Sequence, residues 1–148
     1  MSAGIKPCAR QIYPSRLHAI TAANTYNLHI TFASFCVEMH GDGWSTKGYR
    51  SDSGSVVAYL SFDETICEQA RQAEHDNDHA MLGVLLGYPA CCITYFCSVF
   101  NENNTDPVHD TVHDLLSYTD REEQNIFHYP CTPYCQQSIN FARLTLNF

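Results

Sequence analysis

Two short cysteine motifs, each containing proline, constrain this chain more than any other feature of its sequence. The first is GYPACC, residues 87–92, and the second is HYPCTPYC, residues 128–135. Proline is favoured at the first position of a helix, where its missing N–H group would be unpaired in any case. Each motif therefore predicts a helix whose first turn carries cysteine.

The positions of these cysteines predict their chemistry. If Pro89 and Pro133 each begin a helix, Cys91 and Cys135 both occupy the third helical position. Unpaired backbone N–H groups and the helix dipole favour negative charge there, and the thiolate is the form of cysteine that binds metals or attacks electrophiles. Adjacent helical residues point about 100° apart. Cys91 is therefore the better candidate for a ligand or nucleophile, and Cys92 is a second ligand, a resolving thiol or a core residue.

The second motif has the spacing of half a metal site. His128, Cys131 and Cys135 are separated by two and three residues, and Cys91 or Cys92 could complete a set of four ligands. Zinc and an iron–sulfur cluster both accept mostly sulfur ligation. The alternatives are a metal-free thiol pair and buried free cysteines, joined as a disulfide if the compartment is oxidising. Cys36 and Cys97 lie among apolar residues and are expected to fill the core.

Histidines interleaved with carboxylates form a second group of candidates. They come in pairs four residues apart, a spacing that places both imidazoles on one helix face, as two-histidine metal sites require. The alternative is a solvated acidic face. The candidate catalytic residues are Cys91, Cys92, His75, Asp76, His79, His109 and His113.

The first half of the chain predicts a small antiparallel sheet. Residues 28–37 and 55–62 are rich in β-branched and aromatic side chains, as in strands. Residues 40–55 are rich in Gly, Ser and Asp and predict a long loop between them.

The second half predicts helices. Residues 61–64 fit a capping box that opens a helix to about Leu86, and Gly87 is its natural stop. Further helices are expected from Pro89, Pro107 and Pro133. The apolar positions of the first helix are Ile66, Ala70, Ala73, Ala80, Met81 and Val84. Asn77 falls within this apolar stripe, so its amide needs a partner. We expect an α+β fold, with a small antiparallel sheet from the N-terminal half packed by helices from the C-terminal half, in a single domain over residues 1–148.

Charge and hydropathy limit the partners. The formal net charge is −8, from 16 acidic and 8 basic residues, which disfavours nucleic acid because phosphate binding depends on clustered Lys and Arg. The N-terminus lacks the apolar core of a signal peptide, and no run reaches the ~18 apolar residues of a membrane span. We therefore expect a soluble cytoplasmic protein with no membrane partner.

The two cysteine motifs together resemble a family of uncharacterised prokaryotic proteins, catalogued as a domain of unknown function, that carries Gly-Tyr-Pro-x-Cys-Cys and His-x-Pro-Cys-x-x-x-Cys. The resemblance covers mainly residues 85–138 and supplies no activity. It implies that the two motifs share one site, whose matching positions are Gly87, Tyr88, Pro89, Cys91, Cys92, His128, Pro130, Cys131, Cys135 and Ser138.

The leading functional hypothesis is a small cysteine-rich protein that binds zinc or an iron–sulfur cluster and acts as an enzyme on a small molecule. Its metal ligands would be Cys91 or Cys92 with His128, Cys131 and Cys135. A metal-free thiol enzyme is the second hypothesis. The third is an acidic, non-enzymatic interaction or inhibitor protein with a basic protein partner.

Overall fold

The computed structural model describes residues 6–41, 46–101, 103, 130–132 and 135–146. These residues form two compact units. The first, named the sheet unit, spans Lys6–Leu86, and the second, named the cysteine unit, comprises the described residues from Gly87 onward. The single domain expected over residues 1–148 stays a prediction.

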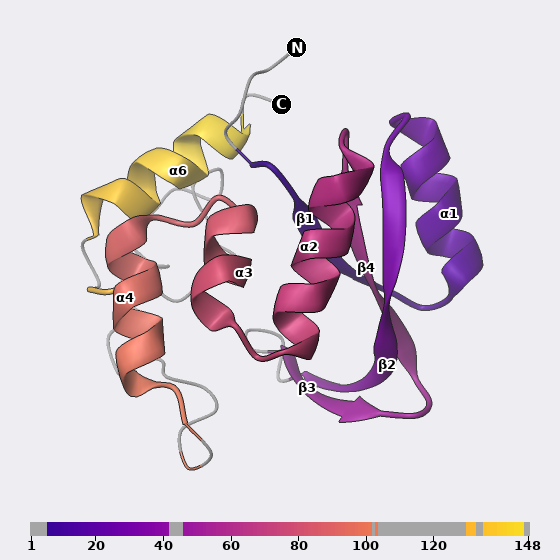
Figure 1. Ribbon diagram of the computed structural model, residues 1–148, viewed down its shortest axis with the longest axis horizontal. Helices are drawn as coiled ribbons and strands as arrows, with labels where there is room; N and C mark the ends of the chain where they lie inside the picture. The colour runs from indigo at the N-terminus through magenta and orange to yellow at the C-terminus, as the bar shows by residue number, and fades with distance from the viewer. Residues whose placement is uncertain (1–5, 42–45, 102, 104–129, 133–134, 147–148) are drawn as a thin grey trace. The chain divides into compact units, whose positions relative to one another are not determined.

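A four-stranded antiparallel sheet forms the centre of the sheet unit (Figure 1). In spatial order its strands are β1 (Ala9–Tyr13), β4 (Ser55–Ser61), β2 (His29–Gly41) and β3 (Thr46–Ser51). The strands predicted at residues 28–37 and 55–62 are confirmed as β2 and β4, which pair with Phe32 opposite Ala58. The expected α+β class is also confirmed, since an N-terminal antiparallel sheet is followed by C-terminal helices.

The prediction of one long loop over residues 40–55 is wrong, because this segment contains β3. Strand β3 pairs with one edge of β2, where Ser51 lies opposite Cys36, and β4 pairs with the other edge, where Val56 lies opposite the same residue. Hydrogen bonds from β2 hold β3 as an edge strand despite its polar composition, since strand formation depends strongly on the partner.

The chain has to cross β2 between these two strands, and Gly54 allows the crossing. Its φ is +113°, and a Cβ atom there would lie 2.6 Å from the backbone oxygen of Val37. Only glycine combines this backbone conformation with so close an approach to another backbone.

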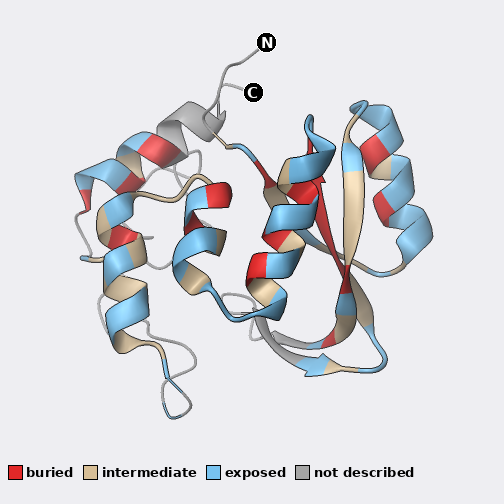
Figure 2. Cartoon of the chain, in the orientation of Figure 1, coloured by how far each residue is buried: buried red, intermediate tan, exposed pale blue. Residues whose placement is uncertain are grey.

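Two helices cover opposite faces of this sheet (Figure 1). The helices of the sheet unit are α1 (Arg16–Thr25), α2 (Glu64–His75) and α3 (His79–Leu85). Ala19 and Ala23 of α1 pack against Ala58 and Leu60 of β4. Tyr59 points to the other face, because successive strand residues alternate, and its hydroxyl bonds to α2. Figure 2 shows the buried positions of α1 on its side toward the sheet.

Helix α1 has a weak sequence signal. Its buried face consists of two alanines, whereas Leu17 and Ile20 are exposed. An amphipathic pattern is therefore nearly absent, and the periodicity of apolar residues does not reveal this helix.

The prediction of a single helix from residue 61 to Leu86 is wrong in two respects. Helix α2 begins at Glu64, and its N-cap is Asp63, which accepts a hydrogen bond from the backbone N–H of Thr65 at 2.8 Å. Ser61 instead ends β4, where its hydroxyl donates to the backbone oxygen of Pro7 at 2.7 Å.

The second error concerns Asn77, which ends α2 rather than lying inside a helix. Its φ is 56°, a left-handed conformation that asparagine tolerates better than most residues. The backbone N–H of Asn77 donates to Glu74 at 3.2 Å, and that of Asp78 donates to Ala73 at 2.8 Å. This pair of bonds is the Schellman pattern of a helix C-terminus.

The break also changes which residues of α3 are buried. Met81 and Val84, assigned to the apolar stripe, are 49% and 59% exposed, and Ala80 is exposed as well. Gly83 and Leu85 are buried instead. Because the helix is interrupted at Asn77, the residues of α3 do not continue the apolar face of α2. The stop predicted at Gly87 is confirmed, because this residue has φ 74° directly after the C-cap.

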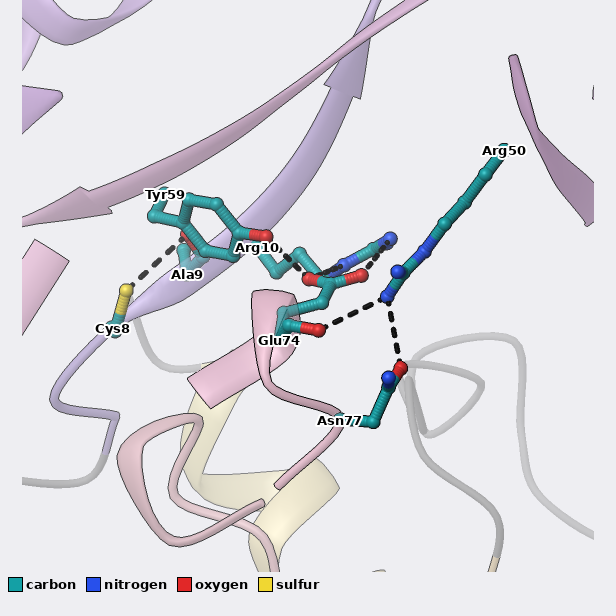
Figure 3. Close-up of polar contacts among 7 residues, drawn as sticks. All are labelled: Cys8, Ala9, Arg10, Arg50, Tyr59, Glu74 and Asn77. Carbon is teal, nitrogen blue, oxygen red and sulfur yellow. Dashed lines mark hydrogen bonds and ion pairs between the residues drawn. The ribbon is translucent and has the colours of Figure 1, made fainter. Parts of the chain in front are cut away.

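A largely buried carboxylate, 11% exposed, joins α2 to the sheet (Figure 3). Glu74 accepts two hydrogen bonds from the Arg10 guanidinium, each 2.8 Å long, and a third from the Tyr59 hydroxyl at 2.5 Å. Arg50 donates to the backbone oxygen of Glu74 at 3.0 Å and to the side-chain oxygen of Asn77 at 3.4 Å. The partner expected for Asn77 is thus Arg50, and Asn77 itself is exposed.

Two helices are described in the cysteine unit, α4 (Ala90–Val99) and α6 (Gln136–Leu146). Pro89 is the N-cap of α4 rather than its first residue, with φ −59° and ψ 137°. The rings of Tyr88 and Phe141 meet edge to face with centroids 6.4 Å apart. The helix predicted from Pro107 lies outside the described residues.

Among the helices that the structure describes, none combines the length and apolar character needed to cross a membrane.

Candidate metal centre

Four cysteine sulfurs meet in the cysteine unit. Those of Cys91, Cys92, Cys131 and Cys135 all lie within 4.8 Å of one another. The Cys91 sulfur is 3.8 Å from that of Cys92 and 3.7 Å from that of Cys135, and the remaining distance in this triangle, Cys92 to Cys135, is 3.6 Å. None of the four is in a disulfide. The expectation that the two motifs meet is confirmed.

The N-terminus of α4 positions two of the thiols. Because Pro89 is the N-cap, Cys91 is the second helical residue and Cys92 the third, one position earlier than predicted. The backbone N–H of Cys92 donates to the oxygen of Pro89 at 3.0 Å. Side chains of a helix tilt toward its N-terminus, so both sulfurs reach the space in front of the first turn. The prediction that Cys91 is the better candidate is therefore wrong in its geometric premise, since Cys92 is equally close to the other sulfurs.

The start of α6 positions Cys135. This residue lies directly before the first helical residue, and its backbone oxygen accepts from the N–H of Ile139 at 3.1 Å. Cys135 thus has the place of an N-cap rather than the third helical position predicted from Pro133. An N-cap side chain faces the unpaired N–H groups of the first turn, and the backbone of Ser138 supplies such a hydrogen bond to the Cys135 sulfur.

Polar groups surround the four sulfurs. The hydroxyl oxygen of Ser138 lies 3.1 Å from the Cys92 sulfur, and this serine is completely buried. The backbone N–H of Cys131 donates to the same sulfur at 3.4 Å. On the exposed side, the Cys91 thiol donates to the side-chain oxygen of Gln137 at 3.4 Å. Gln137 was not a candidate from the sequence, because a glutamine two residues after a cysteine carries no distinctive signal.

The surroundings separate the pKa values of the thiols. Burial raises the pKa of Cys92 to about 12. Burial, followed by hydrogen bonding with Cys135, raises the pKa of Cys131 to about 11. Burial opposes ionisation of Cys135 as well, but hydrogen bonds from the side chain and backbone of Ser138 and from the Cys92 and Cys131 thiols lower its pKa to about 7. One thiolate is thus stabilised within the cluster near neutral pH.

Of the predicted histidines, the described residues include only His75 and His79. His128, His109 and His113 lie outside the described residues. His75 is the last residue of α2 and His79 the first of α3, so the break at Asn77 removes the shared helix face predicted for them.

Near this break, one histidine contacts a carboxylate. The exposed His75 ring lies 3.1 Å from Asp76, whose carboxylate also accepts two 2.9 Å bonds from Gln72. The hydrogen bonds from Gln72, and then that from His75, lower the pKa of Asp76. Their predicted catalytic roles stay predictions.

The other cysteines divide by burial. Cys8 and Cys67 are fully buried in the sheet unit, and burial raises the pKa of Cys8 to about 12. Cys36 is half-buried in β2. Cys97 is exposed on α4, so its prediction as a core residue is wrong.

The arrangement could hold a metal ion. Four sulfur donors lie within 4.8 Å of one another, two helix N-termini contribute favourable dipoles, and hydrogen-bond donors lie around the sulfurs. No family model, curated protein or solved structure matches this chain.

Proposed function

We propose that the cysteine unit binds a single thiophilic metal ion, with zinc as the preferred occupant, through Cys91, Cys92, Cys131 and Cys135. The observation that carries this proposal is the separation of the four sulfurs, all within 4.8 Å. Four cysteines are one of the standard ligand sets of structural zinc sites.

The sulfur separations match the size of such a site. In a tetrahedron with zinc–sulfur bonds of about 2.3 Å, neighbouring sulfurs lie about 3.8 Å apart. The three distances among Cys91, Cys92 and Cys135 are 3.8, 3.7 and 3.6 Å. Hydrogen-bonded thiols can approach equally closely, so metal content has to be measured.

The same distances favour a single ion over an iron–sulfur cluster. In a cluster, the cysteine ligands are distributed over several iron atoms and sulfide fills the space between them. Such ligands stand farther apart than the edges of a one-metal tetrahedron. Four sulfurs also complete the coordination of zinc, so the proposal does not require His128 as a ligand.

A closed set of four ligands supports a structural role. Catalytic zinc sites keep one position for water or substrate, whereas structural sites fill all four positions with protein ligands. The ion would join the first turn of α4, through Cys91 and Cys92, to Cys131 and to Cys135, which directly precedes α6. We propose that metal binding holds these segments together, and that any activity on a small molecule uses other groups.

The family resemblance implies that the two motifs share one site. Residues from both motifs contribute sulfurs to one cluster, as the resemblance implies. We propose that the paired motifs define a shared metal site in that family.

Metal content of the full chain tests the proposal. The protein would be purified with and without added zinc under anaerobic conditions and examined by elemental analysis. We expect about one zinc per chain, lost in the double variant Cys92→Ser, Cys135→Ser. The control is Cys97→Ser, which removes an exposed cysteine from α4 outside the cluster.

Two results would overturn the proposal. One is a metal-free protein whose four cluster cysteines are alkylated in the native state, which would favour a thiol enzyme using the Cys135 thiolate. The other is a brown protein containing several irons and sulfide.

A further inference from the structure

Ser138 is a buried polar residue in direct contact with the proposed metal ligands. It is 0% exposed, and its hydroxyl oxygen lies 3.1 Å from the Cys92 sulfur. It is also the third residue of α6, three positions after Cys135. A hydroxyl in a buried site needs a hydrogen-bond partner, and the Cys92 sulfur is within hydrogen-bond distance of this one.

Helix geometry brings Ser138 to two ligands at once. The third helical residue lies above the N-cap, and its backbone N–H points toward the N-cap side chain. The backbone and side chain of Ser138 both bond to Cys135, while its hydroxyl also reaches Cys92. One residue therefore contacts sulfurs that come from α4 and from the start of α6.

The direction of these bonds follows from the charge of the ligands. A cysteine bound to a metal is a thiolate and has no proton to donate. The Ser138 hydroxyl must then be the donor and the sulfur the acceptor. Hydrogen bonds of this kind orient metal ligands and adjust how strongly the sulfur donates electrons to the metal.

We propose that Ser138 is a positioning residue for the metal centre: its hydroxyl donates to the Cys92 thiolate and its backbone N–H donates to the Cys135 thiolate, which sets the orientation and electron donation of both sulfurs. This inference depends on the proposed metal site. It assigns to the hydroxyl a role beyond filling space in the interior.

A pair of substitutions isolates the hydroxyl. Ser138→Thr keeps it and adds a methyl group, whereas Ser138→Val has nearly the same shape as threonine and lacks it. Any effect of the added methyl group in this buried position is common to both variants. Ser98→Ala is the control, since it removes an exposed hydroxyl from α4 that donates to the backbone oxygen of Tyr95 at 2.7 Å, outside the cysteine cluster.

Two measurements on the full chain read out the role. Zinc affinity would be measured by chelator competition, and the sulfur-to-cobalt charge-transfer band would be recorded after loading with Co²⁺. We expect Ser138→Val to lose roughly 10- to 100-fold in zinc affinity and to shift this band to lower energy, because the sulfur lone pairs lose a hydrogen bond. Ser138→Thr should restore most of both, and Ser98→Ala should match the unsubstituted protein.

The outcomes separate the two proposals. If the unsubstituted chain binds neither zinc nor cobalt through sulfur, the metal site itself is wrong. If it binds both metals but Ser138→Val and Ser138→Thr have equal affinities and equal charge-transfer energies, the metal site stands and the role of Ser138 is overturned.

Discussion

The sulfur of Cys92 lies 3.6 Å from the sulfur of Cys135, although 43 positions separate them in the chain. Both residues are buried and each comes from a helix N-terminus. This relationship converts two local motifs into one cluster. Its consequences for reactivity and for stability can be measured separately.

Thiol reactivity should follow burial and metal occupancy. In the native zinc-loaded protein we expect iodoacetamide to modify exposed Cys97 first, whereas Cys8 and Cys67 react only after unfolding, because burial raises the pKa of both. The four cluster cysteines should become reactive when a chelator removes the metal. Mass spectrometry of time points identifies the sites. Rapid native modification of Cys8 would contradict the burial described for it.

Metal removal should loosen the cysteine unit selectively. Each ligand pair comes from a different segment, so loss of the ion removes the bonds that join α4 to the start of α6. Hydrogen exchange should increase in α4 and α6 after chelation, while β4 and α2 retain their protection. The Cys97→Ser variant should respond like the unsubstituted chain. Equal loss of protection throughout β4 would show that the metal supports the whole molecule.

Glu74 should contribute far more to stability than a surface glutamate on the same helix. Glu74→Ala leaves Arg10 and the buried Tyr59 hydroxyl without their shared acceptor, which should cost about 3–5 kcal/mol. Glu68 is the matched control, because it is half exposed and pairs with Arg71 three residues later. Glu68→Ala should cost under about 1 kcal/mol. Denaturant unfolding measures the free energy of unfolding of both variants. Equal losses would show that the Glu74 network contributes no more to stability than a surface ion pair.

Glu74 should also make the free energy of unfolding depend on pH. Burial opposes ionisation of Glu74, but the Arg10 hydrogen bonds and charge outweigh it and hold its pKa below the usual value. Between the folded and unfolded pKa values, the unfolded chain binds more protons. The stabilisation is therefore complete above the unfolded pKa, about 4.3, and is lost as pH falls through the lower folded pKa.

Comparison with Glu74→Gln isolates this effect, because glutamine does not ionise. The difference in unfolding free energy between the original chain and this variant should shrink as pH falls below about 4.3. A difference that stays constant from neutral pH to pH values near 3 would contradict the lowered pKa.

Gly54→Ala should disrupt the crossing between β3 and β4. The new methyl group would meet the Val37 oxygen at 2.6 Å, in a backbone conformation that alanine rarely adopts. We expect a loss of about 1–3 kcal/mol. Ser53→Ala, next to it and exposed, should change stability by less than about 0.5 kcal/mol. Thermal unfolding compares the two, and similar melting temperatures would refute the close approach.

Local patterns predicted part of the fold well. Alternating β-branched and aromatic residues identified β2 and β4, and Gly87 marked a helix end through its left-handed backbone. These features depend on a few neighbouring residues. Helix α1 and strand β3 were missed for the opposite reason, since two buried alanines form the face of one and pairing with β2 supports the other.

The break at Asn77 shows how a short local signal can be overlooked. Periodicity suggested one helix, but an asparagine followed by Asp78 is also a helix end and a new N-cap, and Asp78 accepts a bond from the Met81 N–H at 3.0 Å. This helix break is predictable from neighbouring residues alone, because a helix end and an N-cap are both local features. Arg50, which bonds to Asn77 across 27 positions, could not be identified from sequence spacing.

The sequence by itself determined that two proline-containing motifs bring cysteines to helix starts, because helix initiation and the helix dipole are local properties. Only the tertiary structure decided that Cys92 joins Cys91 in the cluster, that Cys135 has the N-cap position, and that Ser138 lies buried beside their sulfurs. Distances between residues some forty positions apart, and the burial that separates their pKa values, depend on how the helices pack.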